Sequence, residues 1–417
     1  MNDINKETLS IKFSETREEA KEEYEKHLGS FLRDSPVVAR RGDPDVADLL
    51  FGDPHDPSLT GLGEILHTQV DISQEKGYRY VHHMEEARAA AAKALSQRTS
   101  LDFAVEDLFL TTGAFSGLVT CLQALCEKNS EVVYFSPPWF YYRSMIKSVG
   151  AIPKGVDLNP EDWSIPFDKL AEAIGPKTSA ILVNSPHNPS GKIFSDSELS
   201  ELAQVVSAAS KRLGRDIPII SDEAYSRIVY ECSHAPTPAK YYPATIIIYT
   251  YGKTLLAPSL RLGYMVLAPG FPGALKMRRM FDAIQPMGGW LLPSCLVQRA
   301  LPDLELLCVD LVQLKHRRDK LVEALREGGY TVIPAEGTFY MLVKSPQLDD
   351  EAFSRYLESR NVLVLPGSTL EVPGTFRVSL TASDEMIDQA SEVFKSGWQP
   401  FFINYNEEKY DKIKLNK

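Results

Sequence analysis

Cysteine is sparse in this chain, and basic residues are outnumbered by acidic ones. Its 417 residues include 5 cysteines, and 45 Lys+Arg stand against 56 Asp+Glu, for a formal net charge of −11. The cysteines form no CxxC pair and no Cys/His spacing typical of a metal site, so we expect reduced thiols and no metal centre. A duplex-binding surface needs a basic footprint, so we expect no nucleic-acid partner.

Long apolar runs are also missing. No stretch of about 18 apolar residues occurs, so we expect no membrane span, and the opening MNDINKETLSIKF has no apolar core of signal-peptide length. We therefore expect a cytoplasmic protein. Hydrophobic residues at 44% and charged residues at 24% are typical of a globular protein. The chain exceeds the length at which a single core usually stops growing, which predicts two domains.

Short apolar runs alternate with amphipathic stretches between about residues 107 and 267. The runs include EVVYFS, SAILVN and TIIIYT, and the stretches between them include FSGLVTCLQALCEK and DSELSELAQVVSAASKRLG. This alternation predicts an α/β fold, with a three-layer αβα large domain whose mainly parallel sheet is covered on both faces. No strand is followed by GxGxxG, which argues against a plain NAD-binding domain.

The pattern changes after about residue 303. Residues 303–327 favour one long helix, and YTVIP, TFYMLVK, VLVLPG and FRVSL then read as strands around one helical stretch, DDEAFSRYLESR. We therefore expect a large domain over residues 57–315. A smaller α+β domain would combine residues 1–56 with residues 316–417.

Functional groups follow the predicted strands, where ligands bind in doubly wound sheets. The segments are 111–114, 137–139, 184–189, 222–225 and 250–253. Together they supply a helix N-terminus, an aromatic ring, an amide, a carboxylate, a phenol and an amine. A flat, phosphorylated nitrogen heterocycle that carries an aldehyde would need all of these groups.

Six motifs in one order resemble those of the class I/II aminotransferases, which include aspartate aminotransferase and belong to the pyridoxal-phosphate fold type I superfamily. The motifs are LLFGDP, SPHNPSG, SDEAY, TYGKTLLAPSLRLGY, PAEGTFY, and VLVLPG with FRVSL. The resemblance implies pyridoxal 5′-phosphate as cofactor and transfer of an amino group between an L-amino acid and a 2-oxo acid. It also implies a homodimer with active sites at the interface.

The resemblance assigns the chemistry to four residues. Lys253 would hold the cofactor as a Schiff base and later move a proton at the substrate Cα. Asp222 would keep the pyridine nitrogen protonated through a charge-assisted bond. Tyr225 and Asn188 would bond the ring oxygen, and Asn188 would also border the substrate. Taken alone, Lys253 also suits an exposed lysine after a strand, and Asp222 a helix N-cap. Tyr225 also suits a packed core, and Asn188 a turn before proline.

The same resemblance places the phosphate against a helix N-terminus and an arginine. Arg261 and Thr250 would bind it through their side chains. Backbone N–H groups in the first turn of a helix would add to them, helped by the helix dipole. These N–H groups would belong to Gly113, Ala114 and Phe115. Gly113 would also let the backbone approach the phosphate closely.

The remaining roles concern the ring face, the partner subunit and the substrate. Trp139 would stack on the ring, and Arg377 would fork onto the substrate α-carboxylate. A tyrosine of the neighbouring subunit reaches the phosphate in this family. Tyr78 is our candidate, with Tyr80 as the alternative, because YRYVHHME departs from the family pattern here.

The sequence indicates less about substrate preference. Gly52 in LLFGDP and Trp290 are further candidates for substrate contact. Dicarboxylate-specific aspartate transaminases place a second arginine where Gln285 stands in this chain. A neutral amide does not repay the desolvation of a second carboxylate, so we expect aspartate and glutamate to be disfavoured by this route.

Two other functions stay open at this point. An enzyme of the same fold could carry out elimination, replacement or cyclisation of an amino acid, because the scaffold hosts several reactions. A sensor that merely binds the cofactor would need an added DNA-binding domain, and residues 1–50 are too short and too acidic for one. Stoichiometric formation of a keto acid would separate transamination from elimination.

Overall fold

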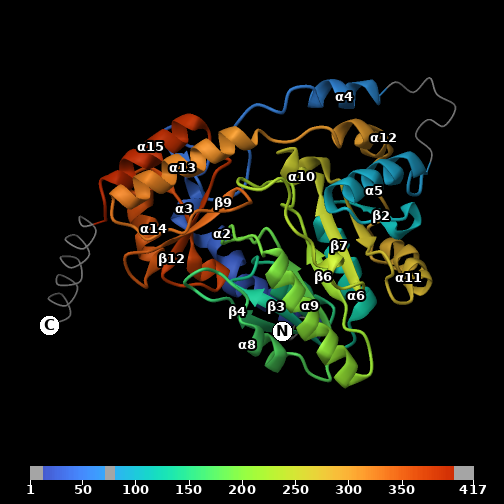
Figure 1. Ribbon diagram of the computed structural model, residues 1–417. Helices are drawn as coiled ribbons and strands as arrows, with labels where there is room; N and C mark the ends of the chain where they lie inside the picture. Colours follow the sequence, from blue (N-terminus) through green and yellow to red (C-terminus); the bar gives the residue numbers. More distant parts are fainter. Residues whose placement is uncertain (1–12, 71–79, 399–417) are drawn as a thin grey trace, which may run out of the picture.

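The chain folds around a seven-stranded sheet in a computed structural model that describes residues 13–70 and 80–398 (Figure 1). The strand order is β2-β8-β7-β6-β5-β3-β4, with β8 antiparallel to both of its neighbours and the other pairs parallel. The expected mainly parallel sheet is confirmed. Its strands are β2 (Leu108–Thr111), β3 (Glu131–Ser136), β4 (Ile152–Asp157), β5 (Thr178–Asn184), β6 (Ile219–Asp222), β7 (Thr245–Thr250) and β8 (Gly263–Leu267).

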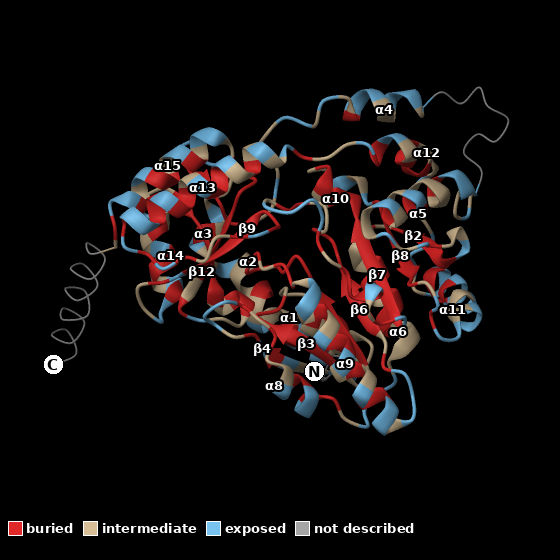
Figure 2. Cartoon of the chain, in the orientation of Figure 1, coloured by how far each residue is buried: buried red, intermediate tan, exposed pale blue. Residues whose placement is uncertain are grey.

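Helices cover both faces of this sheet, and its central strands are buried (Figure 2). One face packs against α6 (Ala114–Leu125), α7 (Tyr142–Ser148) and α11 (Ala274–Met287). The other face packs against α5 (Glu85–Thr99), α8 (Phe167–Ala173), α9 (Asp196–Leu213) and α12 (Cys295–Leu304). Burial on two faces explains the near-continuous apolar strands, and the predicted αβα arrangement is confirmed.

One strand of the large sheet was not foreseen. Strand β4 lies at the sheet edge beside β3 and contains Pro153 and Gly155. Both residue types weaken a strand pattern, and Pro is tolerated at edges because no further strand needs its missing N–H. Several of its residues are exposed, so its sequence lacks the apolar run that marks the inner strands.

A smaller antiparallel sheet follows in the order β11-β12-β9, formed by β9 (Tyr340–Lys344), β11 (Leu365–Pro366) and β12 (Thr375–Ser379). A separate apolar core joins it to α13 (Leu311–Glu327), α14 (Asp350–Glu358) and α15 (Asp384–Lys395). Near the N-terminus, β1 (Ala47–Asp48) pairs in parallel with β10 (Val362–Leu363). The N-terminal segment thus reaches the C-terminal part of the chain. The remaining short elements are α3 (Pro36–Ala39), α4 (Leu62–Thr68), α10 (Tyr251–Thr254), η2 (Val105–Asp107), η3 (Pro238–Lys240), η4 (Pro258–Leu260) and η5 (Gly367–Leu370).

The single long helix expected over residues 303–327 is wrong. Helix α12 ends at Leu304 and α13 begins at Leu311, with an irregular segment over 305–310. Asp310 caps the new helix by accepting hydrogen bonds from the N–H groups of Val312 and Gln313. Arg227 binds the backbone carbonyls of Glu305 and Leu307, which satisfies acceptors that a continuous helix would have used.

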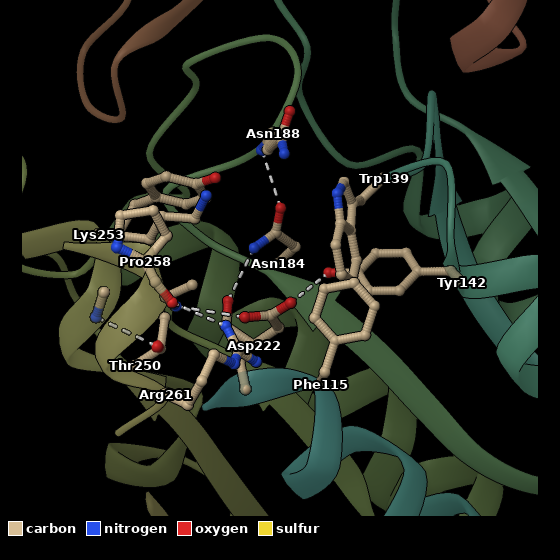
Figure 3. A pocket seen from close by; sticks show the side chains of 14 residues that line it. Phe115, Trp139, Tyr142, Asn184, Asn188, Asp222, Thr250, Lys253, Pro258 and Arg261 are labelled. Carbon is tan, nitrogen blue, oxygen red and sulfur yellow. Dashed lines mark hydrogen bonds between the residues drawn. The ribbon is translucent and has the colours of Figure 1, made fainter. Parts of the chain in front are cut away.

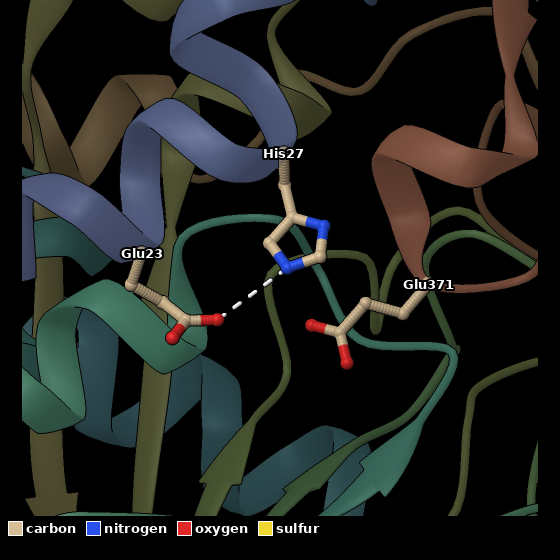
Figure 4. A group of neighbouring side chains, drawn as sticks. All are labelled: Glu23, His27 and Glu371. Atoms are coloured by element: carbon tan, nitrogen blue, oxygen red, sulfur yellow. Dashed lines mark ion pairs between the residues drawn. The ribbon is translucent and has the colours of Figure 1, made fainter.

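The N-terminal helices are held by an ion-pair cluster. Helix α1 (Glu15–Tyr24) continues through η1 (Glu25–Gly29) and α2 (Ser30–Asp34), and α1 packs against α7. Its Glu23 pairs with Arg143 and Lys147 of α7. Glu23, His27 and Glu371 converge (Figure 4), in the one grouping of possible metal ligands among the described residues. Because two cations already neutralise Glu23, we interpret this grouping as structural ion pairing.

No helix in the described part of the chain is both long and apolar enough to cross a membrane.

Candidate active site

A cavity of about 190 Å³ opens where the central strands of the large sheet end (Figure 3). Parallel strands present their carboxyl ends at one edge, which brings the segments that follow them together. Nine of the residues predicted from the sequence line it: Ala114, Phe115, Trp139, Asn188, Asp222, Tyr225, Thr250, Lys253 and Arg261. Tyr142, Asn184, Ala224, Gly252 and Pro258 complete the wall.

Lys253 lies on the short helix α10, directly after β7. Its Nζ is 5.7 Å from the ring centroid of Tyr225 and 5.4 Å from that of Phe339. The hydroxyl of Thr250 accepts a hydrogen bond from the N–H of Gly252 and so caps this turn. The Lys253 amine therefore lies beside the ring of Tyr225, which the sequence predicted as its partner in the site.

Asp222 is a buried carboxylate at the end of β6, with 4% of its surface exposed. The hydroxyl of Tyr142 donates to its Oδ2 at 2.6 Å, and the N–H of Ala224 donates to its Oδ1 at 3.2 Å. Burial raises the pKa of Asp222, against the lowering effects of these donors and of the Lys253 charge. The two donors favour the ionised form that a protonated ring nitrogen needs.

A chain of hydrogen bonds joins this carboxylate segment to the smaller sheet. The amide of Asn184 donates to the backbone carbonyl of Asp222 at 2.9 Å and accepts from the N–H of Asn188 at 2.8 Å. The side-chain oxygen of Asn188 accepts from Nη1 of Arg377 at 3.1 Å. Arg377 in β12 is thereby brought to the cavity edge, although it does not line the wall itself.

Arg377 is almost fully buried, at 1% exposure. Its Nη2 donates to the carbonyl of Leu50 at 3.2 Å, and its guanidinium lies 3.8 Å from the ring centroid of Tyr340. Its Nε has no hydrogen-bond partner within the described residues. Burial lowers the pKa of Arg377. A buried guanidinium with an unused donor fits an anionic ligand, because an unpaired buried donor is costly.

The opposite corner of the cavity is shaped for a phosphate. Gly113 has φ +87° and is the N-cap of the twelve-residue helix α6, whose first turn carries Ala114 and Phe115. A Cβ at position 113 would lie 2.7 Å from Nη2 of Arg261. Arg261 donates to the carbonyl of Thr112 at 2.9 Å, so its guanidinium is fixed beside this helix N-terminus. The donor set matches an anion site.

Three further residues singled out from the sequence, Gly52, Gln285 and Trp290, do not line this cavity. Gly52 lies against Tyr340, where a Cβ would stand 2.3 Å from the phenol oxygen. Trp290 is 37% exposed beside Gly288. Gln285 is buried in α11, where its amide donates to the Leu110 carbonyl at 2.9 Å. Tyr78 lies outside the described residues.

Two residues of the site were missed as contributors. Tyr142 stands in the aromatic run WFYY, which gave no reason to choose one ring over another. Asn184 ends β5 and was noted only as part of its loop. Its partners are set by the way β5 and β6 pair, with Asn184 opposite Asp222.

Comparisons with known proteins identify the family. Residues 48–394 match the family described as aminotransferase class I and II. The chain is 28% identical over 364 residues to an aspartate/prephenate aminotransferase of Thermus thermophilus, covering 85% of this chain and 91% of that protein. It is 26% identical over 289 residues to a methionine aminotransferase of Escherichia coli, covering 66% and 73% of the two chains.

Solved structures show the same fold. An aminotransferase from Eubacterium rectale superposes with a TM-score of 0.80 at 28% identity, covering 93% of this chain and 95% of that one. An aspartate aminotransferase from Thermotoga maritima gives 0.75 at 25% identity, covering 94% and 98%.

The fold and the cavity define an enzyme of the pyridoxal-phosphate fold type I class. Within that class, the chain belongs to the aminotransferase class I and II family, because the match spans most of its length. It is therefore a pyridoxal-phosphate-dependent aminotransferase. The residues present fit the cofactor, since the Gly113–Arg261 corner suits a phosphate and Asp222 and Lys253 face the same cavity.

Proposed function

We propose that Lys253, Asp222 and Tyr225 carry out transamination between an L-amino acid and a 2-oxo acid in this cavity. The observation that supports this is their meeting in one cavity with an anion corner on one side and the unpaired Arg377 donor on the other. Bound pyridoxal phosphate supplies an electron sink for breaking a bond at Cα. The protein supplies position, charge and a proton carrier.

The cofactor would be held from three directions. Arg261, Thr250 and the first turn of α6 would bind its phosphate. The ring would lie against Trp139, whose indole lines the cavity. Asn188 would bond the ring oxygen through its amide NH2 group, because its side-chain oxygen already accepts from Arg377.

Three ionisable groups would then hold or transfer the protons of the reaction. Asp222, held by Tyr142, would keep the ring nitrogen protonated. Burial raises the pKa of Tyr225 well above its usual value, so its phenol stays protonated and can donate to the ring oxygen. The amine of Lys253, once released, would carry a proton to and from the substrate Cα. Arg377 would bind the α-carboxylate and hold Cα within its reach.

We propose a substrate with a neutral side chain. The Arg377 corner is walled by aromatic rings, with Phe140 at 5.9 Å and Tyr340 at 3.8 Å from the guanidinium. Arg41 lies over the neighbouring Phe51, but its guanidinium binds two carboxylates, of Asp48 and Asp53. A cation that is already neutralised attracts a second substrate carboxylate weakly.

Aspartate is the second candidate, because two of the relatives named above act on it by name. Mixing the cofactor-loaded protein with single amino acids, and following its visible spectrum, decides between the two. A neutral aromatic or aliphatic amino acid should give the fastest bleaching. A strong and selective response to aspartate would overturn the neutral-substrate proposal and leave the transaminase intact.

We also propose a homodimer, a cytoplasmic location, and the domain division made from the sequence. The irregular segment at 305–310 supports the division, because α12 packs on the large sheet and α13 on the smaller one. Exposed apolar side chains at Met287, Trp290 and Leu291 support a subunit interface. Sedimentation at several protein concentrations tests the dimer.

Borohydride reduction followed by peptide mass spectrometry tests the central assignment. The cofactor mass should be found on Lys253 and on no other lysine. An adduct elsewhere, or none, would refute the proposed roles. Formation of one keto acid per amino group transferred excludes elimination.

A further inference from the structure

One of the other buried carboxylates, Glu305, lies outside the cavity wall, and the proposed chemistry does not use it. Glu305 follows the last residue of α12, and its side chain is 7% exposed. It accepts hydrogen bonds from three side chains that belong to three different segments: Arg98 of α5, Arg227 after β6, and Tyr251 of α10. None of these four residues lines the cavity.

One of these bonds reaches the turn that carries the lysine. The hydroxyl of Tyr251 donates to Oε2 of Glu305 at 2.5 Å, and Tyr251 is fully buried two residues before Lys253. Burial, followed by the nearby Glu305 charge, raises the pKa of Tyr251 well above its usual value. The phenol therefore remains a donor to the carboxylate at all ordinary pH values.

Helix α10 needs such external support because it has four residues. An isolated helix of that length is not stable in water. Beyond the lysine, the hydroxyl of Thr254 is 2.6 Å from that of Tyr249, and the carbonyl of Thr254 accepts from the N–H of Val309 at 2.8 Å. Hydrogen bonds therefore hold the chain both before and after Lys253. Their partners are residues of the 305–309 segment and Tyr249 of strand β7.

A second bond reaches the segment that carries the phenol. Arg227 lies two residues after Tyr225, and its Nη1 donates to Oε1 of Glu305 at 3.3 Å. Its Nη2 donates to the carbonyls of Glu305 and Leu307 at 3.1 and 2.9 Å. One carboxylate therefore ties the Tyr225 segment to the Lys253 turn.

We propose that Glu305 is a positioning residue that sets the Lys253 amine against Tyr225 and supplies a negative charge behind the lysine. This inference rests on the proposed roles of those two residues. A carboxylate is suited to the task because charge-assisted bonds are short and directional, and because three donors from three segments fix its place.

The charges around Glu305 determine in which direction its replacement should shift the pKa of the cofactor-linked nitrogen. It faces the cations of Arg98 and Arg227. The phenols of Tyr249 and Tyr264 and the thiol of Cys308 are also close to it. The carboxyl of Glu223 faces Arg98. Replacing Glu305 by glutamine removes the negative charge that pairs with both guanidinium groups. Extra positive charge disfavours a protonated nitrogen nearby, so the pKa of the cofactor-linked nitrogen should fall.

The test is a spectroscopic pH titration of the cofactor-loaded protein. In Glu305→Gln, the visible-absorbance midpoint should fall by about one pH unit. Turnover kcat should fall about tenfold with little change in KM, because lysine alignment matters most in the transition state. Tyr251→Phe removes one hydroxyl and no charge, so it should lower kcat with a smaller midpoint shift. The double variant should be no worse than Glu305→Gln alone.

Asp107→Asn is the matched control. Asp107 is likewise a buried carboxylate paired with an arginine, at 2.7 Å from Nε of Arg278, but it lies at η2 away from the cavity. This variant should lose stability and keep the wild-type midpoint and kcat. Equal midpoints and kcat in wild type, Glu305→Gln and Tyr251→Phe would overturn the inference.

The outcomes separate this inference from the proposed function. If wild-type protein shows no borohydride-trapped cofactor on Lys253, the proposed function fails first. If wild type is trapped and active while the Glu305 and Tyr251 variants match it, only the positioning role fails. If Glu305→Gln does not fold, Tyr251→Phe and its kcat carry the decision, because that variant keeps the ring and every charge.

Discussion

Replacing Tyr142 with phenylalanine isolates what a single hydroxyl contributes to the cofactor carboxylate. The substitution removes the 2.6 Å hydrogen bond to Asp222 and keeps the ring, which packs in the core edge-to-face against Trp139. Tyr142 is 2% exposed, so water does not readily take the place of its hydroxyl. Asp222 would retain the N–H of Ala224 as its remaining protein donor.

The magnitude follows from the kind of bond that is lost. A hydrogen bond to a charged group contributes about 1.5–3 kcal/mol, which corresponds to a rise of about one to two units in the pKa of Asp222. The direction is upward because Tyr142 lowers this pKa, while burial already raises it. Only ionised Asp222 keeps the ring nitrogen protonated. As the pH is lowered, the variant should therefore lose activity at a higher pH than wild type does.

The assay is the pH profile of kcat/KM. In Tyr142→Phe the acid limb should move up by about one to two pH units, and kcat/KM at the optimum should fall roughly 10- to 100-fold. Tyr141→Phe is the control, because it makes the same change one residue earlier, on a ring that stacks on Tyr24. An unmoved acid limb with kcat/KM within about threefold of wild type would refute the argument that this hydroxyl supports the charge on Asp222.

Three other substitutions test separate parts of the structure. Lys253→Ala should abolish both turnover and the borohydride adduct, and residual transamination would contradict its role. Gly113→Ala should weaken cofactor affinity about tenfold or more, measured by equilibrium dialysis, since its Cβ would meet Arg261 at 2.7 Å. Burial alone would raise the pKa of Glu23, but Arg143 and a neighbouring lysine bring it down to about 2 from 4.5. A depressed pKa contributes stability above the unfolded value and loses it on acidification. Glu23→Gln should therefore cost about 2 kcal/mol in urea unfolding near neutral pH, with a deficit that shrinks only below pH 4.5.

The large sheet could be predicted from the sequence where its strands are buried on both faces. Inner strands such as β7 are buried at every position, so their sequences are largely apolar. The motifs after these strands converge because parallel strands share one carboxyl edge. Edge strand β4 and the break at 305–310 were not foreseen. Their causes lie in a missing neighbour strand and in an arginine that binds two distant carbonyls.

The supporting residues of the site were hidden for a related reason. Tyr142 and Asp222 are 80 positions apart in the chain, and Tyr251 and Glu305 are 54 apart. A motif records residues that one local backbone turn must carry, whereas these pairs depend on how helices dock on the sheet. A docked helix can offer a donor from several neighbouring positions, so spacing does not fix which residue serves. Such residues are therefore identified by geometry and then tested by removing one hydroxyl or one charge at a time.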